Sequence, residues 1–554
     1  MKDAQGRGAL GGAPATEGTS GRGEWARGAL LGGAYVALLV STSGAVGYAR
    51  DEGIYFQAAE AYAAWLDALA REPARALGRE AIDAAFGVNH EHPPLFKLLF
   101  ALSWRALGAL GWPLGEGLSF RLPGMASAGL AVALLYRWGG RAGGRAAGLG
   151  AALAFALVPT TFFHAHLACF DVPIAALWLL TAYAYERSLA SPSWPRAALA
   201  ALAFGLALAT KHNSWLLPPA LGAHALASLA LAPGREAARR RARALGLMAL
   251  VGPIVLAALW PWLWHDAASR LAEYVGFHRR HDYYNIEFLG TTYFRPPFPR
   301  SYAWVMTAAS LPLVTMVLAA IGLAAGARAL VAAATTARAR ELASTALLWA
   351  LGVVVNYAPW LSTETPIFGG TKHWLPAYPF LALFAGVGFA RLGLALRASL
   401  PPRPFRRLAP AAAALPAFAA PAAETLRAPA WSLSAYAPQV GGTPGAASLG
   451  LNRTFWGHTS GAVLDALNAL PPGAAVFAHD TGPGAWRMLQ REGRLRADLR
   501  FVDAPAGADA ALYHHEPHMA IVEYAIWVAL GTSAPALVRG PDGVPTVLVY
   551  QRRR

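Results

Sequence analysis

The stretch SFRLPGMASAGLAVALLYRWGGRAGGR, residues 119–145, joins a long apolar run (119–138) to three closely spaced arginines, Arg137, Arg141 and Arg145. A helix needs about 20 mostly apolar residues to cross the hydrocarbon of a bilayer, and cytoplasmic loops of membrane proteins are rich in Lys and Arg. The same pattern recurs along the chain, with apolar runs separated by short arginine-rich segments. We therefore predict a polytopic helical membrane protein.

The composition supports this prediction. Hydrophobic residues make up 56% of the 554 residues and charged residues only 14%, against about 25% charged in a typical soluble domain. The net charge of +16 could indicate a nucleic-acid partner. The arginines, however, lie in short loops between apolar runs, which favours anchoring at a membrane face and no nucleic-acid partner. The single cysteine, Cys169, excludes an internal disulfide framework and a Cys-based zinc cluster.

Eleven segments are predicted to cross the membrane: 27–47, 119–138, 146–165, 172–190, 197–213, 214–232, 244–263, 303–324, 343–361, 374–396 and 407–424. A further apolar segment, 94–110, is short and carries Lys97 and Arg105. Each such charge costs about 2.5–3.5 kcal/mol near the bilayer centre. If 94–110 does not cross, every large arginine cluster between spans falls on the side of the N-terminus. We therefore expect 94–110 to be a surface-lying or re-entrant helix on the outer face.

The chain divides into three parts on this interpretation. Residues 1–26 are predicted to be a disordered cytoplasmic tail, and the apolar run that follows is an anchor because no convincing cleavage site comes after it. Residues 27–424 form the membrane domain, with long outer loops at 48–118 and 264–302. Beyond 425, AAVFAHD, LRFVD, DAALYHH, PALVRG and PTVLVYQ are typical of short strands, with helix-like stretches between the first four. Residues 425–554 are thus predicted to be a soluble extracytoplasmic α/β domain.

Lysine is rare in this chain, with four lysines among 47 basic residues. Lys211 and Lys372 each stand in a Thr-Lys-His segment at the outer mouth of a predicted span, and Lys97 lies at a similar depth. Lysine is a compact point charge on a flexible stem, which can reach the depth of lipid headgroups. Interfacial anchoring is the alternative. Because arginine does the anchoring elsewhere in the chain, the three lysines favour a site for a lipid phosphate.

The first outer loop concentrates acids and histidines. It begins with Asp51-Glu52 directly after the first span and ends with NHEHPPLFK, residues 89–97. The acid pair could equally begin an ordinary helix, because carboxylates complement the N-terminal dipole. His-X-His around Glu91 is a weak pattern for a divalent metal. Asp171, two residues before Pro173, is compatible both with a helix N-cap and with a second catalytic acid.

In order along the chain, these segments resemble the GT-C glycosyltransferases, specifically the protein O-mannosyltransferases and aminoarabinose transferases of the glycosyltransferase family 39 type. The resemblance rests on Asp-Glu after the first span, HPPLFK, FRLPGMASAGLAVALLYRW, HAHLACFDVPIAALWLL, GLALATKHNSWLLPP and GGTKHWLPAYPFLALF. It covers roughly residues 28–396. It implies the GT-C fold: an all-α polytopic membrane protein of about 11 transmembrane helices, here with a C-terminal soluble α/β domain.

The resemblance also implies an activity, namely inverting transfer of a hexose or pentose from a polyprenyl-phosphate donor to a hydroxyl group. A protein, a lipid and a polysaccharide are all open as acceptors. Asp51 takes the role of catalytic base, with Glu52 as its neighbour and Asp171 as a second acid. Glu91 aligns with a proposed metal-binding acid, and His92 replaces a lysine of the family. No cofactor is strictly required, and a divalent cation (Mg, Mn or Zn) near Glu91 is left open.

The remaining predicted site residues fall into two groups. Donor phosphate binding is expected from basic residues at the outer membrane boundary and in the second outer loop: Lys97, Lys211, His212, Lys372, His373, Arg279 and Arg280. Substrate binding is expected from Tyr55, His90, His92 and His281, although the aromatic residues of the second loop also suit an interfacial belt.

Two other classes of function remain as alternatives. A transporter or lipid flippase predicts ionisable residues in mid-span and repeated halves with broken helices, whereas here the charges gather at the membrane faces. A non-catalytic relative would not need the acid pair or the His-Pro-Pro segment. The predicted setting is a bacterial inner membrane, with the N-terminus cytoplasmic and the active site and C-terminal domain outside.

Overall fold

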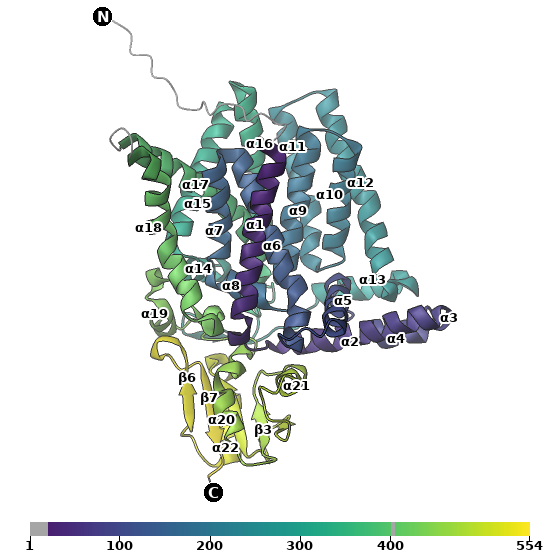
Figure 1. Cartoon of the computed structure of the whole chain (residues 1–554), viewed down its shortest axis with the longest axis vertical. Helices are drawn as coiled ribbons and strands as arrows, with labels where there is room; N and C mark the ends of the chain where they lie inside the picture. Colours follow the sequence, from purple (N-terminus) through teal and green to yellow (C-terminus); the bar gives the residue numbers. More distant parts are fainter. Residues whose placement is uncertain (1–19, 400–404, 554) are drawn as a thin grey trace, which may run out of the picture.

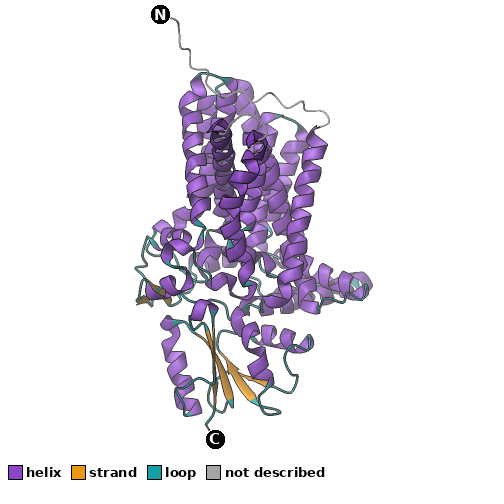
Figure 2. Cartoon of the chain, turned by 60° about the vertical axis from the view of Figure 1, so that its left-hand side comes forward, coloured by secondary structure: helices purple, strands orange, loops and turns teal. Residues whose placement is uncertain are grey.

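The computed structural model describes residues 20–399 and 405–553. It consists of a bundle of long helices with a small α/β domain at one end (Figures 1 and 2). Most of the predicted disordered tail, residues 1–19, lies outside the described residues. Residues 20–26 do not fit that prediction, because they form the first turns of α1 (Ser20–Thr42).

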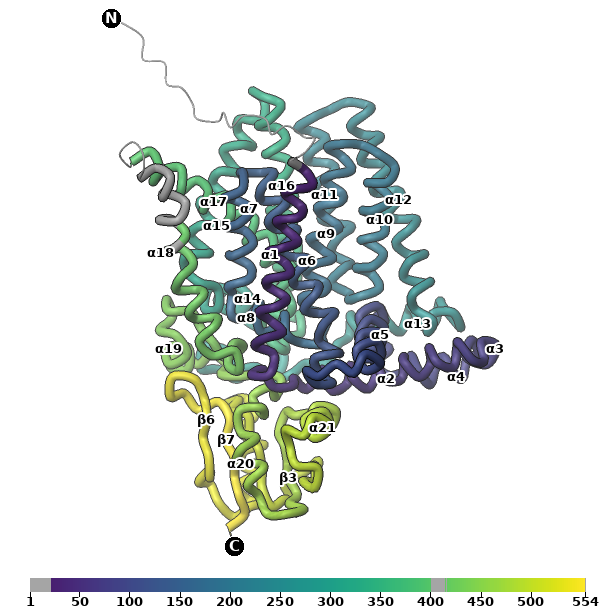
Figure 3. The backbone as a smooth tube through the Cα atoms, viewed as in Figure 1, coloured from purple at the N-terminus to yellow at the C-terminus, as the bar shows by residue number. Residues whose placement is uncertain are grey.

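The predicted membrane domain is helical at every predicted span. Most of the bundle helices lie roughly parallel to one another (Figure 3). They are α1, α6 (Glu116–Gly143), α7 (Arg145–Ala156), α8 (Pro159–His166), α9 (Asp171–Ala190), α10 (Trp194–Leu208), α11 (Leu217–Leu231), α12 (Arg235–Leu259), α15 (Leu313–Val331), α16 (Ala337–Tyr357), α17 (Tyr378–Ser399) and α18 (Phe405–Arg427).

Fewer of these helices are long and apolar enough to cross a membrane than the eleven predicted. Within the described ranges there are seven such helices, or eight if α7 and α8, which are bent by 71° at their junction, count as one span. Proline explains two departures from the predicted spans, one broken and one displaced along the chain, because the residue before a proline is disfavoured in the α conformation. Pro159 begins α8 after the break. Pro312 separates the short α14 (Tyr302–Ser310) from α15 within the predicted span 303–324.

The arginine-rich loops gather at one end of the bundle. The loops that join α6 to α7, α11 to α12 and α15 to α16 all lie away from the C-terminal domain (Figure 1). Contacts between residues far apart in the sequence support this arrangement. Arg145 pairs with Glu24 at 2.8 Å, and Arg338 donates a hydrogen bond to the Arg141 carbonyl at 3.2 Å. The clustering of charge on one side is therefore as predicted.

The two long loops lie at the other end, beside the C-terminal domain. The first contains α2 (Arg50–Arg71), α3 (Pro73–Ala76), α4 (Arg79–Phe86) and α5 (Leu95–Ala109). The 15 residues of α5 extend about 22 Å as a helix, less than the roughly 30 Å of hydrocarbon, in agreement with the prediction that 94–110 does not span. The second loop contains α13 (Ala267–Arg279) and a small antiparallel pair, β1 (Ile286–Phe288) and β2 (Thr291–Tyr293).

The C-terminal domain contains a five-stranded sheet in the order β4-β3-β5-β7-β6. All five predicted strands are present: β3 (Ala475–Ala478), β4 (Arg500–Val502), β5 (Ala510–His514), β6 (Leu537–Arg539) and β7 (Val547–Gln551). Strand β3 runs parallel to β4 and β5, while β7 is antiparallel to β5 and β6. Helix α21 (Pro483–Arg491) follows β3 and α22 (Ala520–Leu530) follows β5, whereas the expected helix between β4 and β5 is absent from 503–509.

The domain is fastened to the bundle through α2. The backbones of α2 and α21 meet at two glycines: a Cβ atom on Gly53 would lie 2.5 Å from the Ala485 nitrogen, and one on Gly484 would meet the Gly53 carbonyl. Arg491 pairs with Glu60 on α2 and with Glu116 on α6. The domain thus sits directly over the start of α2, which is where Asp51 and Glu52 lie.

Candidate active site

A cavity of about 280 Å³ lies where the first loop, the bundle and the C-terminal domain meet. Ten of the residues predicted from the sequence to form the site line it: Asp51, Tyr55, Glu91, His92, Asp171, Lys211, His212, His281, Lys372 and His373. They come from segments as far apart as α2 and the loop before α17. The fold therefore brings most of the predicted site together.

Two acid–lysine pairs form the charged core of the cavity. The Lys211 ammonium donates a hydrogen bond to Asp171 Oδ1 at 2.6 Å, and Lys372 Nζ lies 3.6 Å from Asp51 Oδ2. Asp171, Lys211 and Lys372 are each less than 10% exposed, and the side chain of Asp51 is 19% exposed. At such burial, charges are retained only when paired.

The two Thr-Lys-His segments touch each other. Asn213, which follows Lys211-His212, donates a hydrogen bond to the His373 carbonyl at 3.1 Å. Lys372 Nζ also lies 3.8 Å from the ring centre of Trp456, a cation–π contact with the C-terminal domain. The two segments are thus joined by a hydrogen bond from a side chain to the backbone, and both lysines line one cavity.

Glu52 has a different role from Asp51. It is fully buried and forms a two-pronged ion pair with Arg121, with Nε–Oε1 and Nη2–Oε2 distances of 2.8 and 2.7 Å. It also accepts hydrogen bonds from the backbone nitrogens of Ala49 and Ala168, each at 2.9 Å. Arg121 in turn donates to the carbonyls of Val46 and Gly47. Glu52 does not line the cavity. It fixes the turn that carries Asp51.

Lys97 lies outside the cavity, in contrast to the prediction that it binds donor phosphate. Its ammonium is fully buried and donates to the carbonyls of Asn89 and His92 at 2.6 and 2.8 Å. Burial lowers the pKa of Lys97 to about 7. Lys97 therefore holds the loop at 89–92 closed.

Three further predicted residues lie away from the cavity. His90 pairs with Glu273 at 2.9 Å and packs its ring on Trp262. Arg279 and Arg280, at the end of α13, are exposed to solvent and do not line the cavity. Their neighbour His278, which the sequence did not single out, does line it and donates a hydrogen bond from Nε2 to the Glu91 carbonyl at 2.9 Å.

Three histidines that line the cavity, His92, His278 and His373, are neutral groups at neutral pH. Burial lowers the pKa of His92 and His373 well below the usual range for histidine, and that of His278 to about 4. At neutral pH these rings can donate or accept one hydrogen bond at each nitrogen but carry no charge. The cations available to an anionic ligand are accordingly Lys211, Lys372 and Arg50, which also lines the cavity.

The residues present do not form a metal centre. Over 20–399 and 405–553, no group of three or more His, Cys, Asp or Glu side chains is arranged to hold a metal ion. The Glu91 Oε1 atom accepts a hydrogen bond from Asn89 Nδ2 at 2.5 Å. The cation near Glu91 therefore stays a prediction, and no step proposed below depends on it.

The C-terminal domain supplies a wall of the cavity that the sequence did not predict. Trp456, His479, Asp480, Glu516, His518 and Met519 all line it. Asp480 Oδ1 accepts a hydrogen bond from Arg50 Nη1 at 2.5 Å, and the Arg50 nitrogen donates to the Trp456 carbonyl at 2.8 Å. The available signal was the acids and histidines at the ends of two predicted strands: HD at the end of AAVFAHD, and HH at the end of DAALYHH, which is followed by EPH.

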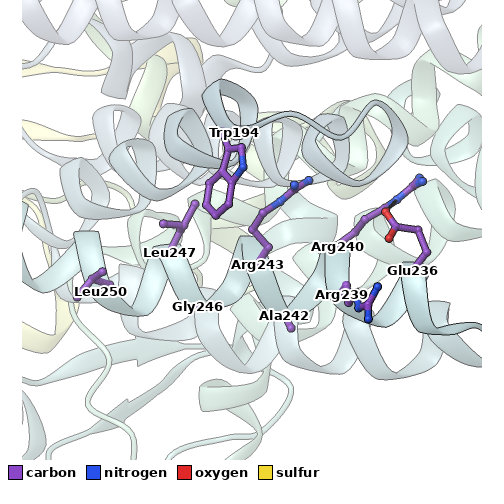
Figure 4. A pocket seen from close by; sticks show the side chains of 9 residues that line it. All are labelled: Trp194, Glu236, Arg239, Arg240, Ala242, Arg243, Gly246, Leu247 and Leu250. Carbon is purple, nitrogen blue, oxygen red and sulfur yellow. Dashed lines mark hydrogen bonds and ion pairs between the residues drawn. The ribbon is translucent and has the colours of Figure 1, made fainter.

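A second hollow, of about 490 Å³, lies at the arginine-rich end between α10 and α12 (Figure 4). Trp194, Arg239, Arg243 and Leu250 line it, and its one carboxylate, Glu236, is paired with Arg240 at 2.9 Å. It offers no unpaired acid to act as a base. The acid–lysine pairs described above line the other cavity, under the C-terminal domain.

Comparison with known proteins agrees with the sequence resemblance. Residues 91–265 match the family model described as dolichyl-phosphate-mannose-protein mannosyltransferase. This segment includes Glu91, His92, Asp171 and Lys211, but neither Asp51 nor Lys372. No curated protein matches the sequence significantly.

Among solved structures, ArnT from Cupriavidus metallidurans bound to undecaprenyl phosphate matches with 16% identity and a TM-score of 0.47, over 96% of this chain and 98% of that chain. The oligosaccharyltransferase of Archaeoglobus fulgidus in its apo form matches with 12% identity and a TM-score of 0.46, over 87% and 64% of the two chains. The match to the family model is thus confined to residues 91–265 of the 554.

Proposed function

We propose that this protein is an inverting glycosyltransferase, which moves a sugar from a polyprenyl-phosphate donor to a hydroxyl acceptor in the cavity beside Asp51. One observation carries the proposal: a partly accessible carboxylate and two buried lysines face one cavity at the end of a membrane-type bundle. These are the groups that such a transfer needs, namely a base and cations for the leaving phosphate.

In the proposed reaction Asp51 takes the proton of the acceptor hydroxyl. The oxygen attacks the anomeric carbon of the donor sugar from the face opposite the phosphate. A new C–O bond forms, the bond from the anomeric carbon to the phosphate oxygen breaks, and the electron pair leaves with the polyprenyl phosphate. Lys372 and Lys211 stabilise the charge that develops on this phosphate, since preorganised cations are worth most where charge grows in the transition state.

The position of the cavity suits a lipid-linked donor. An isoprenoid chain stays in the hydrocarbon, so its phosphate must be bound at headgroup depth. Lys211 stands directly before the short 3-10 helix His212–Leu216 that leads into α11, and Lys372 lies six residues before the start of α17. Both lysines therefore sit at the ends of bundle helices, at one end of the bundle. In the proposed orientation this end faces outward from a bacterial inner membrane, because the arginine-rich loops lie at the opposite end.

A transporter or flippase is the alternative from another class. It would require charged groups along a path through the bundle. The described acid–lysine pairs instead lie at a single end, beneath a soluble domain that contributes to the same cavity. This arrangement favours chemistry at a membrane face.

Mass spectrometry of the reaction products tests the proposal. The purified full-length protein is incubated in detergent with undecaprenyl-phosphate hexoses and pentoses, singly, together with candidate acceptors. The proposal predicts free undecaprenyl phosphate and an acceptor heavier by one sugar residue. Movement of the donor across a vesicle membrane without a new glycosidic bond would support the transporter instead.

A further inference from the structure

The C-terminal domain places its cavity residues where α/β domains commonly bind ligands. His479 and Asp480 directly follow β3, and Glu516 and His518 follow β5, the strand parallel to β3. Ligands of open α/β sheets bind in the crevice at the carboxyl ends of parallel strands. The two loops are joined, because His514 Nδ1 lies 2.7 Å from the His479 carbonyl. This edge of the sheet faces the cavity that contains Asp51.

Side chains on this wall have hydrogen-bonding capacity that the described protein atoms do not use. Glu516 is 6% exposed, and its Oε1 atom has no hydrogen-bond partner. Its other oxygen, Oε2, lies 3.4 Å from His518 Nε2, and the Nδ1 atoms of His518 and His479 also lack partners. A buried polar atom without a partner is costly and calls for an explanation. A bound ligand with several hydrogen-bonding groups provides one.

The backbone is strained at the same place. Asp480 and Trp456 both adopt left-handed conformations, with φ of 54° and 63°. For residues other than glycine this conformation is uncommon and costs free energy, and it occurs most often at functional sites. Here it turns the Asp480 carboxylate toward Arg50 and holds Trp456 under the Lys372 ammonium.

The cavity therefore has two chemically different sides. The bundle side carries the lysines, which suit an anionic phosphate. The side formed by the C-terminal domain carries carboxyl and imidazole groups with the aromatic rings of Phe455 and Trp456. Burial and the neighbouring Asp480 raise the pKa of Glu516 well above its usual range, so that its carboxyl group can donate as well as accept a hydrogen bond.

We propose that the loops after β3 and β5 form the acceptor subsite and bind a hydroxyl-rich carbohydrate through Glu516, Asp480 and His518. The inference rests on the proposed function, because it assigns the acceptor side of the same cavity. Hydroxyl groups both donate and accept, which matches a set of carboxyl and imidazole groups, and aromatic rings can cover the apolar face of a sugar ring. A peptide acceptor would usually be held through its backbone along a sheet edge. The wall instead offers side chains at strand ends.

Direct binding of a sugar in the absence of donor tests this subsite. Saturation-transfer NMR is measured on the full-length protein in detergent, with lactose as the neutral probe and a Ser/Thr-containing peptide as the comparison. We expect lactose binding by the wild type and at least fivefold weaker binding by Glu516→Ala. Asp503→Asn, at an exposed acid of the same domain, is the matched control and should bind as the wild type does.

A second variant tests the subsite even if Glu516→Ala fails to fold. Met519 is only partly buried, so Met519→Trp should fold while filling the subsite, and it should also weaken lactose binding at least fivefold. Equal lactose binding by both variants and the wild type would overturn the inference, as would binding of the peptide alone. A lactose signal lost in Lys211→Ala but kept in Glu516→Ala would place the sugar on the phosphate side and overturn it too.

Kinetics separate this inference from the proposed function. If the wild type transfers sugar, Glu516→Ala should raise the acceptor KM at least tenfold and leave the donor KM within twofold. If the wild type binds lactose through Glu516 but transfers no sugar from any polyprenyl-phosphate donor, the proposed function fails while the carbohydrate subsite stands. Transfer in which Glu516→Ala changes neither KM would overturn the subsite alone.

Discussion

Lys372 connects the parts of the site at the scale of single residues. Its ammonium lies 3.6 Å from Asp51 Oδ2 and 3.8 Å from the ring centre of Trp456. Its place in the cavity could be predicted because lysine is rare in this chain and recurs in Thr-Lys-His. The same reasoning failed for Lys97, which instead donates to the carbonyls of Asn89 and His92. The rarity of lysine singles out these residues in the sequence. Which groups each ammonium contacts depends on the fold.

Separate substitution of Lys372 and Lys97 should distinguish phosphate binding by Lys372 from a structural role of Lys97. Lys372→Ala removes a charge-assisted contact, worth about 1.5–3 kcal/mol, and should weaken binding of undecaprenyl phosphate at least tenfold with little change in thermal stability. Lys97→Ala should lower the midpoint of thermal unfolding and leave the affinity of the folded protein nearly unchanged. Titration calorimetry measures the affinity for undecaprenyl phosphate, and thermal unfolding in the same detergent measures the stability of each variant. Equal loss of affinity in the two variants would contradict the assignment.

Donor binding should also depend on pH through Lys372. Burial lowers the pKa of Lys372, although Asp51 and Asp171 oppose this effect. The protonated ammonium binds the phosphate, so undecaprenyl phosphate should bind best at a pH below the pKa of Lys372 and more weakly as the pH rises through this pKa. Because the pKa is lowered, the decline should occur below the usual lysine value of about 10.4. Binding of undecaprenyl phosphate measured from about pH 7 to 10 should therefore decline. In Lys372→Arg, whose guanidinium stays charged, the decline should be absent or much smaller; an identical decline would exclude Lys372 as the titrating group.

The buried pair of Glu52 and Arg121 should be a determinant of stability. Arg121→Leu leaves a fully buried carboxylate without its partner, which typically costs about 3–5 kcal/mol. Thermal unfolding should therefore shift to clearly lower temperature. The double variant Glu52→Gln with Arg121→Leu removes the unpaired charge and should recover part of the loss. If the double variant loses at least as much stability as the two single variants lose together, Glu52 and Arg121 are not coupled in this way.

At the scale of elements, the start of α2 is the critical segment. It carries Asp51 in its first turn, is anchored through Glu52, and meets α21 backbone to backbone at Gly53 and Gly484. The acid pair was visible in the sequence as a helix start, which the structure confirms. The contact with α21 was not, because a glycine in a helix does not reveal which backbone approaches it.

A methyl group at this contact should loosen the site. Gly53→Ala would place a Cβ atom 2.5 Å from the Ala485 nitrogen, in a contact between two backbones with no flexible side chain to yield. We expect a loss of thermal stability and at least a tenfold drop in sugar transfer, because the wall with Asp480 and Glu516 moves away from Asp51. Gly108→Ala in α5, where the added methyl meets nothing within 4 Å, is the control. A fully active and stable Gly53→Ala protein would contradict this account of the docking.

Other elements show the limit of hydropathy as a guide. The predicted spans 146–165 and 303–324 are both broken near a proline, Pro159 and Pro312. Proline is tolerated inside transmembrane helices when neighbouring groups satisfy the backbone. An average over an apolar run therefore cannot tell a continuous span from two short helices.

At the scale of the whole molecule, the sequence predicted a helical membrane bundle and a C-terminal α/β domain with the right five strands. It did not predict that the domain closes the cavity, because the residues concerned, such as Asp51, Lys372 and Asp480, are hundreds of positions apart. Their approach depends on the docking of α21 on α2 and on Arg50, which reaches Asp480. The bundle and the domain therefore form a single site.

The most direct test of the central claim is the rate of sugar transfer by Asp51→Asn, measured with undecaprenyl-phosphate sugar donors beside binding of undecaprenyl phosphate. Asp67→Asn, on the exposed part of α2, is the control. Since a positioned general base typically contributes about 10²–10⁴-fold, the account predicts that Asp51→Asn binds the lipid but transfers sugar at least 100-fold more slowly, while Asp67→Asn remains active. Transfer by Asp51→Asn at the wild-type rate would contradict the account.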